Sequence, residues 1–140
     1  MDHVTPERRS WLMSRISSRN TKPELAVRRL LHGLGYRFRI HYGGLPGKPD
    51  IVFTRRKKAI FVHGCFWHGH VGCRYAKLPA TRADFWTEKM RRNRERDIRT
   101  NDALVELGWG VMIVWQCELK EKSNAHLTEK LVAFLGPPKG

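Results

Sequence analysis

The sequence has few acidic residues for its number of basic ones. It holds 13 Asp and Glu against 27 Lys and Arg, which gives a formal net charge of +14 over 140 residues. The imbalance is one-sided, because residues 1–99 carry +15 and residues 100–140 carry −1. Such a charge favours a polyanionic partner such as DNA or RNA. An anionic membrane surface is the weaker alternative, since no segment combines a broad apolar face with a basic one.

Long apolar runs are also lacking. No stretch of about 18 apolar residues is present, so no membrane-spanning helix is expected. Residues 1–4 begin no signal-peptide pattern, and we therefore expect a cytoplasmic protein. A chain of 140 residues is long enough for one core and short for two domains. We expect a basic N-terminal arm over residues 1–20, a single domain over residues 21–140, and a monomer.

Cysteine is scarce as well, and the three that are present point to a metal. An odd number cannot all pair, and a disulfide between Cys65 and Cys73, the alternative interpretation, would leave Cys117 unpaired. Cys65 and Cys73 belong to the stretch His63–Cys73, which also contains three histidines. Together with His70 and Cys117 they supply the four soft ligands of a tetrahedral structural zinc site.

Apolar periodicity predicts a small mixed α/β sheet flanked by helices. Helical spacing and capping signals predict helices over residues 21–33, 82–107 and 124–135. Alternation or short apolar runs predict strands over residues 36–40, 51–53, 59–62 and 111–115. The order helix, three strands, helix, strand, helix is typical of the α/β class. The last strand is continuously apolar, so we expect it to be buried on both faces.

Two of these strands carry candidate catalytic residues at one end. Asp50 begins one strand and His63 ends the next, and a hairpin with its turn at residues 55–58 places the two residues opposite each other. Magnesium prefers hard oxygen ligands, so Asp50 is the best candidate to bind a catalytic Mg²⁺. Neutral His68 or His63 can take a proton from an attacking water. The pattern favours metal-assisted phosphodiester hydrolysis.

The long helix also has an unusual face. Trp86, Met90, Asn93 and Asp97 share one side, which begins apolar and ends polar, as expected of a helix that reaches into a site. Phe66 and Trp67, in the loop before this helix, can stack on a base.

Four blocks together resemble the very-short-patch-repair (Vsr) DNA mismatch endonucleases. They are Leu45–Asp50, His63–His68, Phe85–Trp86 with Asn93–Asp97, and Val114–Cys117. The resemblance runs from about residue 13 to residue 135. It implies a restriction-endonuclease-like fold and a magnesium-dependent nick on the 5′ side of the thymine in a T:G mismatch of double-stranded DNA, the step that initiates very short patch repair.

The resemblance also implies roles for individual residues. At the catalytic centre it implies Asp50 and the backbone carbonyl of Val62 as magnesium ligands, His68 as general base, His63 on the scissile phosphate, and Glu24 and Asp97 in support. For the structural zinc it implies Cys65, His70, Cys73 and Cys117. For DNA it implies Phe66, Trp67 and Trp86 as a wedge from the major groove, Met13 from the minor groove, and Asn93 as a further contact.

Some features depart from the family or its superfamily. Val62 stands where relatives can carry Thr, and a backbone carbonyl survives that change. Two residues separate His70 from Cys73 where a shorter spacing occurs, which leaves His68 as the alternative zinc ligand. Val62–Gly64 replaces the Asp/Glu-x-Lys of the wider superfamily, which argues against a lysine-dependent mechanism. The alternatives are a non-catalytic zinc-containing nucleic-acid-binding module, which has no use for Asp50, and a nuclease that cuts intact duplex.

Overall fold

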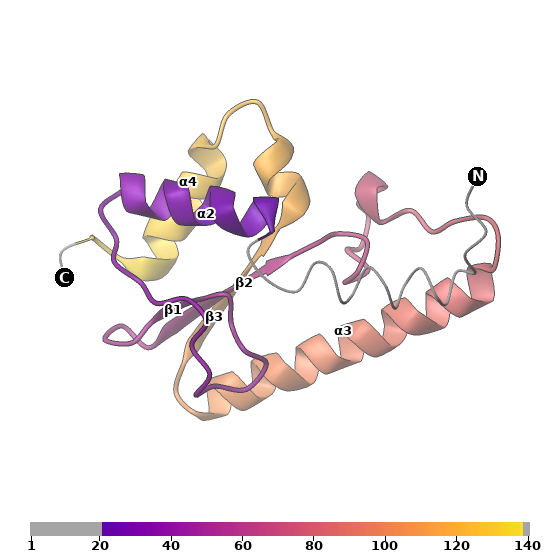
Figure 1. The fold of residues 1–140 in the computed structure, drawn as a ribbon, viewed down its shortest axis with the longest axis horizontal. Coiled ribbons are helices and arrows are strands. Elements are labelled where there is room, and N and C mark those ends of the chain that lie inside the picture. Colours follow the sequence, from indigo (N-terminus) through magenta and orange to yellow (C-terminus); the bar gives the residue numbers. More distant parts are fainter. Residues whose placement is uncertain (1–20, 139–140) are drawn as a thin grey trace.

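The computed structural model of the protein describes residues 21–138, so the predicted arm over residues 1–20, with Met13, lies outside the described part. The helices are α2 (Lys22–Gly33), α3 (Ala83–Glu106) and α4 (Ala125–Leu135). The strands are β1 (Ile51–Phe53), β2 (Lys58–His63) and β3 (Gly110–Trp115), and short 3₁₀ helices cover Arg74–Ala76 and Gln116–Lys120 (Figure 1). No helix within residues 21–138 is long and apolar enough to cross a membrane.

The strands form one mixed sheet in the order β1-β2-β3. β1 runs antiparallel to β2, and β3 runs parallel to β2. A parallel neighbour needs a long crossover, which here includes α3. The predicted class, a small mixed α/β sheet flanked by helices, is confirmed. The predicted limits of the long helix and of the last helix differ from α3 and α4 by one residue at most.

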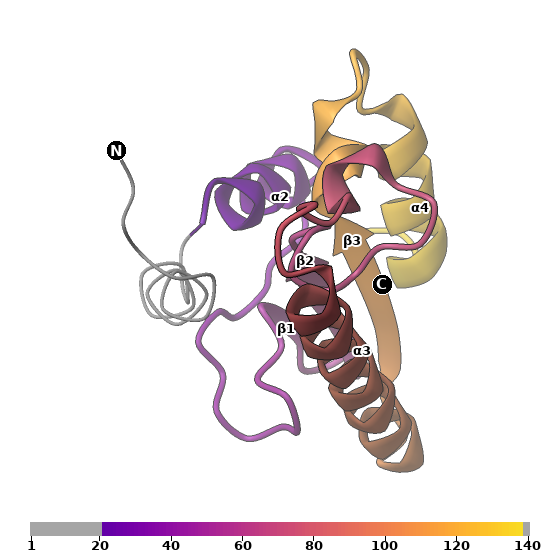
Figure 2. The same cartoon turned by 90° about the vertical axis from the view of Figure 1, so that its right-hand side faces the viewer.

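The two faces of the sheet have different roles. Even-numbered residues such as Ile60 and Val114 join the apolar core under α2 and α4, together with Leu31 and Leu131. Odd-numbered residues of β2 and β3 line a cavity on the side of α3. This division follows from the alternation of side chains along a strand. Figures 1 and 2 show α2 and α4 together on one side of the sheet and α3 on the other.

The predicted strand over residues 36–40 is wrong. It is reduced to a single antiparallel bridge between Arg39 and Val52. β1 has only three residues, and of these only Val52 points its N–H and C=O away from β2. A second residue of the segment 36–40 therefore finds no backbone groups of β1 to pair with. The predicted alternation of burial holds from Tyr36, which is buried, to Arg39, which is exposed, but it fails at Ile40, which is exposed.

The predicted burial of the last strand on both faces is also wrong. Val114 is buried, but the other residues of β3 are only half-buried. β3 is an edge strand of the sheet. Its odd-numbered side chains, Val111 and Ile113, face the cavity rather than a second apolar layer.

The register of the β1–β2 hairpin differs from the predicted one by two residues. Ile51 pairs with Ile60, so Asp50 aligns with Phe61 and not with His63. The turn spans residues 54–57, because Lys57 takes a left-handed backbone conformation with φ 53° and lets β2 begin at the next residue. Asp50 and His63 still lie at the same end of the hairpin.

Candidate active site

A cavity of about 940 Å³ lies between the sheet, α3, the start of α2 and the loop before β1. It brings together every residue predicted to act in catalysis or to bind magnesium. These residues are Glu24, Asp50, Val62, His63, His68 and Asp97. They come from elements far apart in the sequence, and they meet because the start of β1, the end of β2 and the middle of α3 lie at one rim.

Asp50 is held at the end of the hairpin by its neighbours. Its Oδ2 atom accepts a hydrogen bond from the Val62 N–H at 2.7 Å. Burial raises the pKa of Asp50 to about 6, and the adjacent Glu24 carboxyl, which shares a hydrogen bond with it, adds to this effect. Two carboxyl groups forced together in a half-buried place are the arrangement that a divalent cation relieves.

The surroundings of these carboxyl groups fit the same interpretation. The N–H and C=O of one strand residue point to the same edge, so the Val62 carbonyl lies on the side of Asp50. Thr21 Oγ1 caps α2 by accepting the Glu24 N–H at 3.4 Å, as the sequence predicts. The Glu24 side chain, which is 8% exposed, contacts Arg28 at 3.2 Å and Asp50. The donor set at this rim therefore suits a hard divalent ion.

Two stacked imidazoles and a carboxylate form the other wall of the site. The rings of His63 and His68 are parallel within 4°, with centroids 3.6 Å apart. His68 Nδ1 lies 2.7 Å from Asp97 Oδ2. When Nδ1 donates its hydrogen to Asp97, the lone pair of neutral His68 lies on Nε2, which is the basic atom a proton acceptor needs.

His63 is more deeply placed than His68. It is 6% exposed, and burial first, followed by the neighbouring His68, lowers its pKa to about 4 despite the opposing effect of Asp97. His63 is therefore neutral at pH 7. Its Nδ1 atom lies 4.0 Å from Asp97 Oδ2 and has no hydrogen-bond partner among the described residues.

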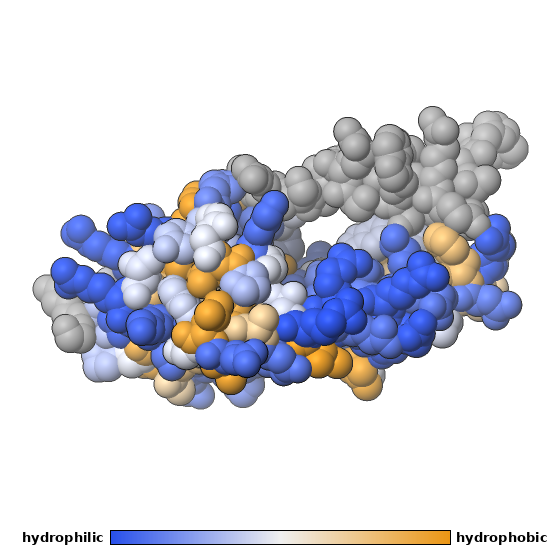
Figure 3. All heavy atoms as spheres, turned by 90° about the horizontal axis from the view of Figure 1, so that it is seen from below, coloured by the Kyte–Doolittle hydropathy of each residue, from blue (hydrophilic) through white to orange (hydrophobic). Residues whose placement is uncertain are grey.

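The polar face of α3 supplies Asp97 and also fixes the loop before it. Asn93 donates from Nδ2 to the Trp67 carbonyl at 2.7 Å and accepts from Arg96 at 2.9 Å. Both ends of its amide are therefore engaged within the protein, so its predicted contact with DNA would require these bonds to be exchanged. On the outer side of α3, Arg91 pairs with Glu88 and Glu95, and Figure 3 shows a mostly hydrophilic surface there.

The three predicted wedge aromatics form one cluster beside the cavity. The Phe66 and Trp67 rings lie 5.1 Å apart at 84°, and Trp86 lies 5.4 Å from Phe66 and 6.2 Å from Trp67. Trp86 is 4% exposed, whereas Phe66 and Trp67 are only half-buried. In this arrangement Trp86 backs the two more accessible rings.

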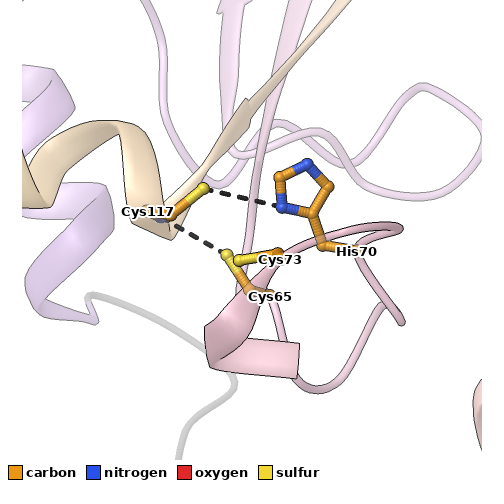
Figure 4. A group of neighbouring side chains, drawn as sticks. All are labelled: Cys65, His70, Cys73 and Cys117. Atoms are coloured by element: carbon orange, nitrogen blue, oxygen red, sulfur yellow. Dashed lines mark hydrogen bonds between the residues drawn. The ribbon is translucent and has the colours of Figure 1, made fainter. Parts of the chain in front are cut away.

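The predicted zinc ligands also come together (Figure 4). The ligand atoms of Cys65, His70, Cys73 and Cys117 all lie within 4.8 Å of one another. Sulfur atoms about 3.8 Å apart are what tetrahedral zinc requires, so the group fits the ion with a small contraction. His68, the alternative ligand, lies instead with His63 and Asp97.

The thiols of this cluster shift one another's pKa values. Burial raises the pKa of Cys65 and raises that of Cys117 to about 12. At Cys73 burial acts in the same direction, but hydrogen bonds from the Tyr75 backbone and from the other thiols lower the pKa overall. A soft cation that replaces the thiol protons would remove this mutual conflict.

Trp115 joins the two groups of histidines, although it is not among the predicted site residues. Its ring stacks on His70 with centroids 4.0 Å apart and planes at 7°. The same ring meets His63 edge-on at 5.3 Å and 77°. Trp115 ends β3, which runs parallel to β2 and its last residue, His63. Its position two residues before Cys117 is the sequence signal that points to it.

Several basic and polar residues of the cavity were also missed. Lys89, Arg96 and Thr100 follow the same helical spacing that singled out Asn93, and they line the cavity from α3. Lys48 and Gln116 line it from loops. Gly47 brings the loop before β1 against α3: its φ is 74°, and a Cβ atom there would lie 2.1 Å from the Thr100 methyl group. Only glycine fits this seam.

The chain is similar to a DNA mismatch endonuclease and to type II nicking enzymes. A family model described as DNA mismatch endonuclease Vsr matches residues 1–74. Type II nicking enzyme V.XorIIP of Xanthomonas oryzae is 57% identical over 120 residues, which cover 86% of this chain and 88% of that protein. DNA mismatch endonuclease Vsr of Escherichia coli is 46% identical over 130 residues, with 91% and 83% covered. Type II nicking enzyme V.NmeAIP of Neisseria meningitidis is 44% identical over 122 residues, with 87% and 86% covered.

Proposed function

Because this chain belongs to the Vsr family of DNA mismatch endonucleases, we propose that it nicks one DNA strand on the 5′ side of the thymine in a T:G mismatch. The reaction is magnesium-dependent phosphodiester hydrolysis. The observation that carries the proposal is the pair of carboxyl groups Asp50 and Glu24 in one cavity with the stacked His63 and His68. A module that only binds nucleic acid gains nothing from a carboxyl pair facing a phosphate.

Asp50 and the Val62 carbonyl would hold the magnesium ion, and Glu24, whose carboxyl contacts Asp50, would support them. The Val62 N–H orients the Asp50 carboxylate through the 2.7 Å hydrogen bond. Magnesium bound there would supply positive charge beside the scissile phosphate. Lys48, Lys89 and Arg96 add basic groups around the same cavity.

His68 is the general base. Its Nε2 atom takes a proton from the attacking water as the new P–O bond forms and the bond to the leaving oxygen breaks. Asp97 keeps the Nδ1 hydrogen in place and balances the charge that develops on the ring. Neutral His63, stacked on His68, contacts the scissile phosphate and excludes water from the inner side of the pair.

The remaining predicted groups serve recognition and stability. Phe66 and Trp67, backed by Trp86, enter the duplex at the mismatch, where a weakened step costs less to unstack. Met13 and the arm over residues 1–20 act from the other groove. Zinc at Cys65, His70, Cys73 and Cys117 ties the loop after β2 to the end of β3. We propose that the protein works as a monomer.

The test is a nicking assay on two duplexes that differ only in a T:G mismatch or a T:A pair. We expect a nick beside the thymine of the mismatch alone, and only with magnesium or a similar divalent ion. Asp50→Asn is expected to abolish nicking while mismatch binding persists, because it removes a ligand charge without changing shape. Equal cutting of both duplexes would contradict the mismatch specificity. Nicking by Asp50→Asn near the wild-type rate would contradict the proposed metal centre.

A further inference from the structure

A second hollow lies away from the catalytic cavity, at the outer edge of β1 and the turn of the β1–β2 hairpin. Its volume is about 730 Å³. Basic side chains surround an apolar floor, and we call this hollow the arginine groove. It consists of Arg37, Arg39, Arg55 and Arg56 around Phe38, Val52 and Phe53.

Three of these arginines have no acidic partner. Within residues 21–138, no carboxylate lies within 4.0 Å of Arg37, Arg39 or Arg55, and all three side chains are exposed. Asp50 is the only acidic residue between positions 25 and 83. The contrast with α3 is clear, because Arg91 and Arg92 there pair with glutamates. Unpaired guanidinium groups on one side of a hollow attract an external anion.

The backbone that carries these arginines is held in place. Arg39 and Val52 exchange two backbone hydrogen bonds of 2.9 Å each. Arg56 donates to the carbonyls of Leu135, Pro137 and Pro138 at 2.6–2.9 Å and so fastens the hairpin turn to the end of α4. The groove is thus formed before a ligand arrives, and Arg37, Arg39 and Arg55 remain as its free donors.

The spacing of the groove from the catalytic cavity suits a DNA duplex. Arg39 pairs with Val52, two residues after Asp50, and Arg55 lies in the turn five residues after Asp50. At about 3.3 Å per residue these positions are roughly 7 Å and up to about 17 Å from Asp50 along β1. Phosphates of one DNA strand follow one another about every 3.4 Å along the helix axis, so the groove lies about two to five of them from the catalytic cavity.

We propose that the arginine groove is a second binding site for the DNA backbone, which takes duplex phosphates about two to five steps from the scissile bond. The proposal rests on the chain acting on DNA, but it does not depend on mismatch specificity. Arg37, Arg39 and Arg55 add affinity and hold the duplex along the molecule. They read no bases, because phosphate contacts carry no sequence information.

The test compares Arg37→Ala/Arg55→Ala with a matched control, Arg91→Ala/Arg92→Ala, which removes the same charge from glutamate-paired sites. Binding is measured by fluorescence anisotropy on a long mismatch duplex and on a mismatch duplex trimmed to about three base pairs on each side of the nick position, at several salt concentrations. For the groove variant we expect several-fold weaker binding of the long duplex. Its slope of log K against log salt should be shallower by about 0.9 for each phosphate that the variant no longer neutralises.

On the trimmed duplex the groove variant is expected to bind as the wild type does, because the remote phosphates are gone. Wild-type-like nicking of the trimmed mismatch duplex at saturation shows that the variant is folded. Equal losses on both duplexes, equal losses in the control variant, or no loss at all would overturn the proposal. Nicking of long matched and mismatch duplexes by the wild type tests the T:G specificity separately, so the two failures can be told apart.

Discussion

Replacing Asp97 with Asn tests the proposed general base most directly. Asp97 Oδ2 lies 2.7 Å from His68 Nδ1 and 4.0 Å from His63 Nδ1, so it is within hydrogen-bonding distance of His68 and not of His63. An amide in its place has no charge and presents a donor as well as an acceptor. The His68 ring is then no longer held with its lone pair on Nε2.

The expected loss follows from the role of the proton acceptor. General-base transfer contributes roughly 10²–10⁴-fold to a rate, which corresponds to about 3–5 kcal/mol of barrier. Asp97→Asn leaves the imidazole present but misdirected, so we expect the nicking rate constant to fall by about 10²-fold or more. Asp97 is 24% exposed, so water can solvate the substituted amide, and we expect folding and DNA affinity to change little.

The assay is single-turnover nicking of a T:G duplex, with binding measured separately. Asp102→Asn is the matched control, because Asp102 is an exposed residue further along α3. If Asp97 acts through His68, the double variant Asp97→Asn/His68→Ala nicks no more slowly than His68→Ala alone. Losses that multiply in the double variant, or a wild-type rate for Asp97→Asn, would refute the assignment.

Three further predictions concern stability and metals. Arg56→Ala should lower the free energy of unfolding by about 1–3 kcal/mol, since it removes donors from three carbonyls, whereas Arg55→Ala should change it by less than about 0.5 kcal/mol in denaturant titrations. Cys117→Ser should lower zinc content and Tm together; a metal-free variant as stable as wild type would contradict the zinc site. Asp50 must ionise to bind a cation, and its pKa is raised to about 6, so magnesium affinity should rise from pH 5 to pH 7 in calorimetric titrations. In the metal-free protein, the raised pKa of Asp50 makes its contribution to folding stability favourable at low pH, and this contribution is lost as pH rises through about 6. A reversed trend would contradict this prediction.

The sequence by itself determined the features that depend on neighbouring residues. Thr21 caps α2, and the ends of α3 and α4 follow from helical spacing and from the glycines Gly108 and Gly136 after them. Three of the predicted zinc ligands lie within the segment from Cys65 to Cys73. Soft ligands that lie so near one another in the sequence are readily recognised. The polar end of the α3 face, which includes Asp97, likewise follows from helical spacing in the sequence. These signals act over one or two helical turns or one loop, so no distant segment can change them.

Only the tertiary structure decided how distant segments meet. The hairpin register depends on the left-handed Lys57, and it aligns Asp50 with Phe61 rather than His63. Glu24 reads as a cap partner in sequence, and it lies beside Asp50 only because α2 packs on the sheet near the start of β1.

The tertiary structure also gives different roles to the members of two similar pairs, His68 and His70, and Arg55 and Arg56. Trp115 on β3 stacks on His70, which lies with the cysteines, while α3 draws His68 to Asp97. The end of α4 engages Arg56 and leaves Arg55 exposed. In each pair the two residues share a chemistry, and their roles depend on which side chain a distant element reaches. Local propensity cannot encode that choice, because packing between remote segments makes it.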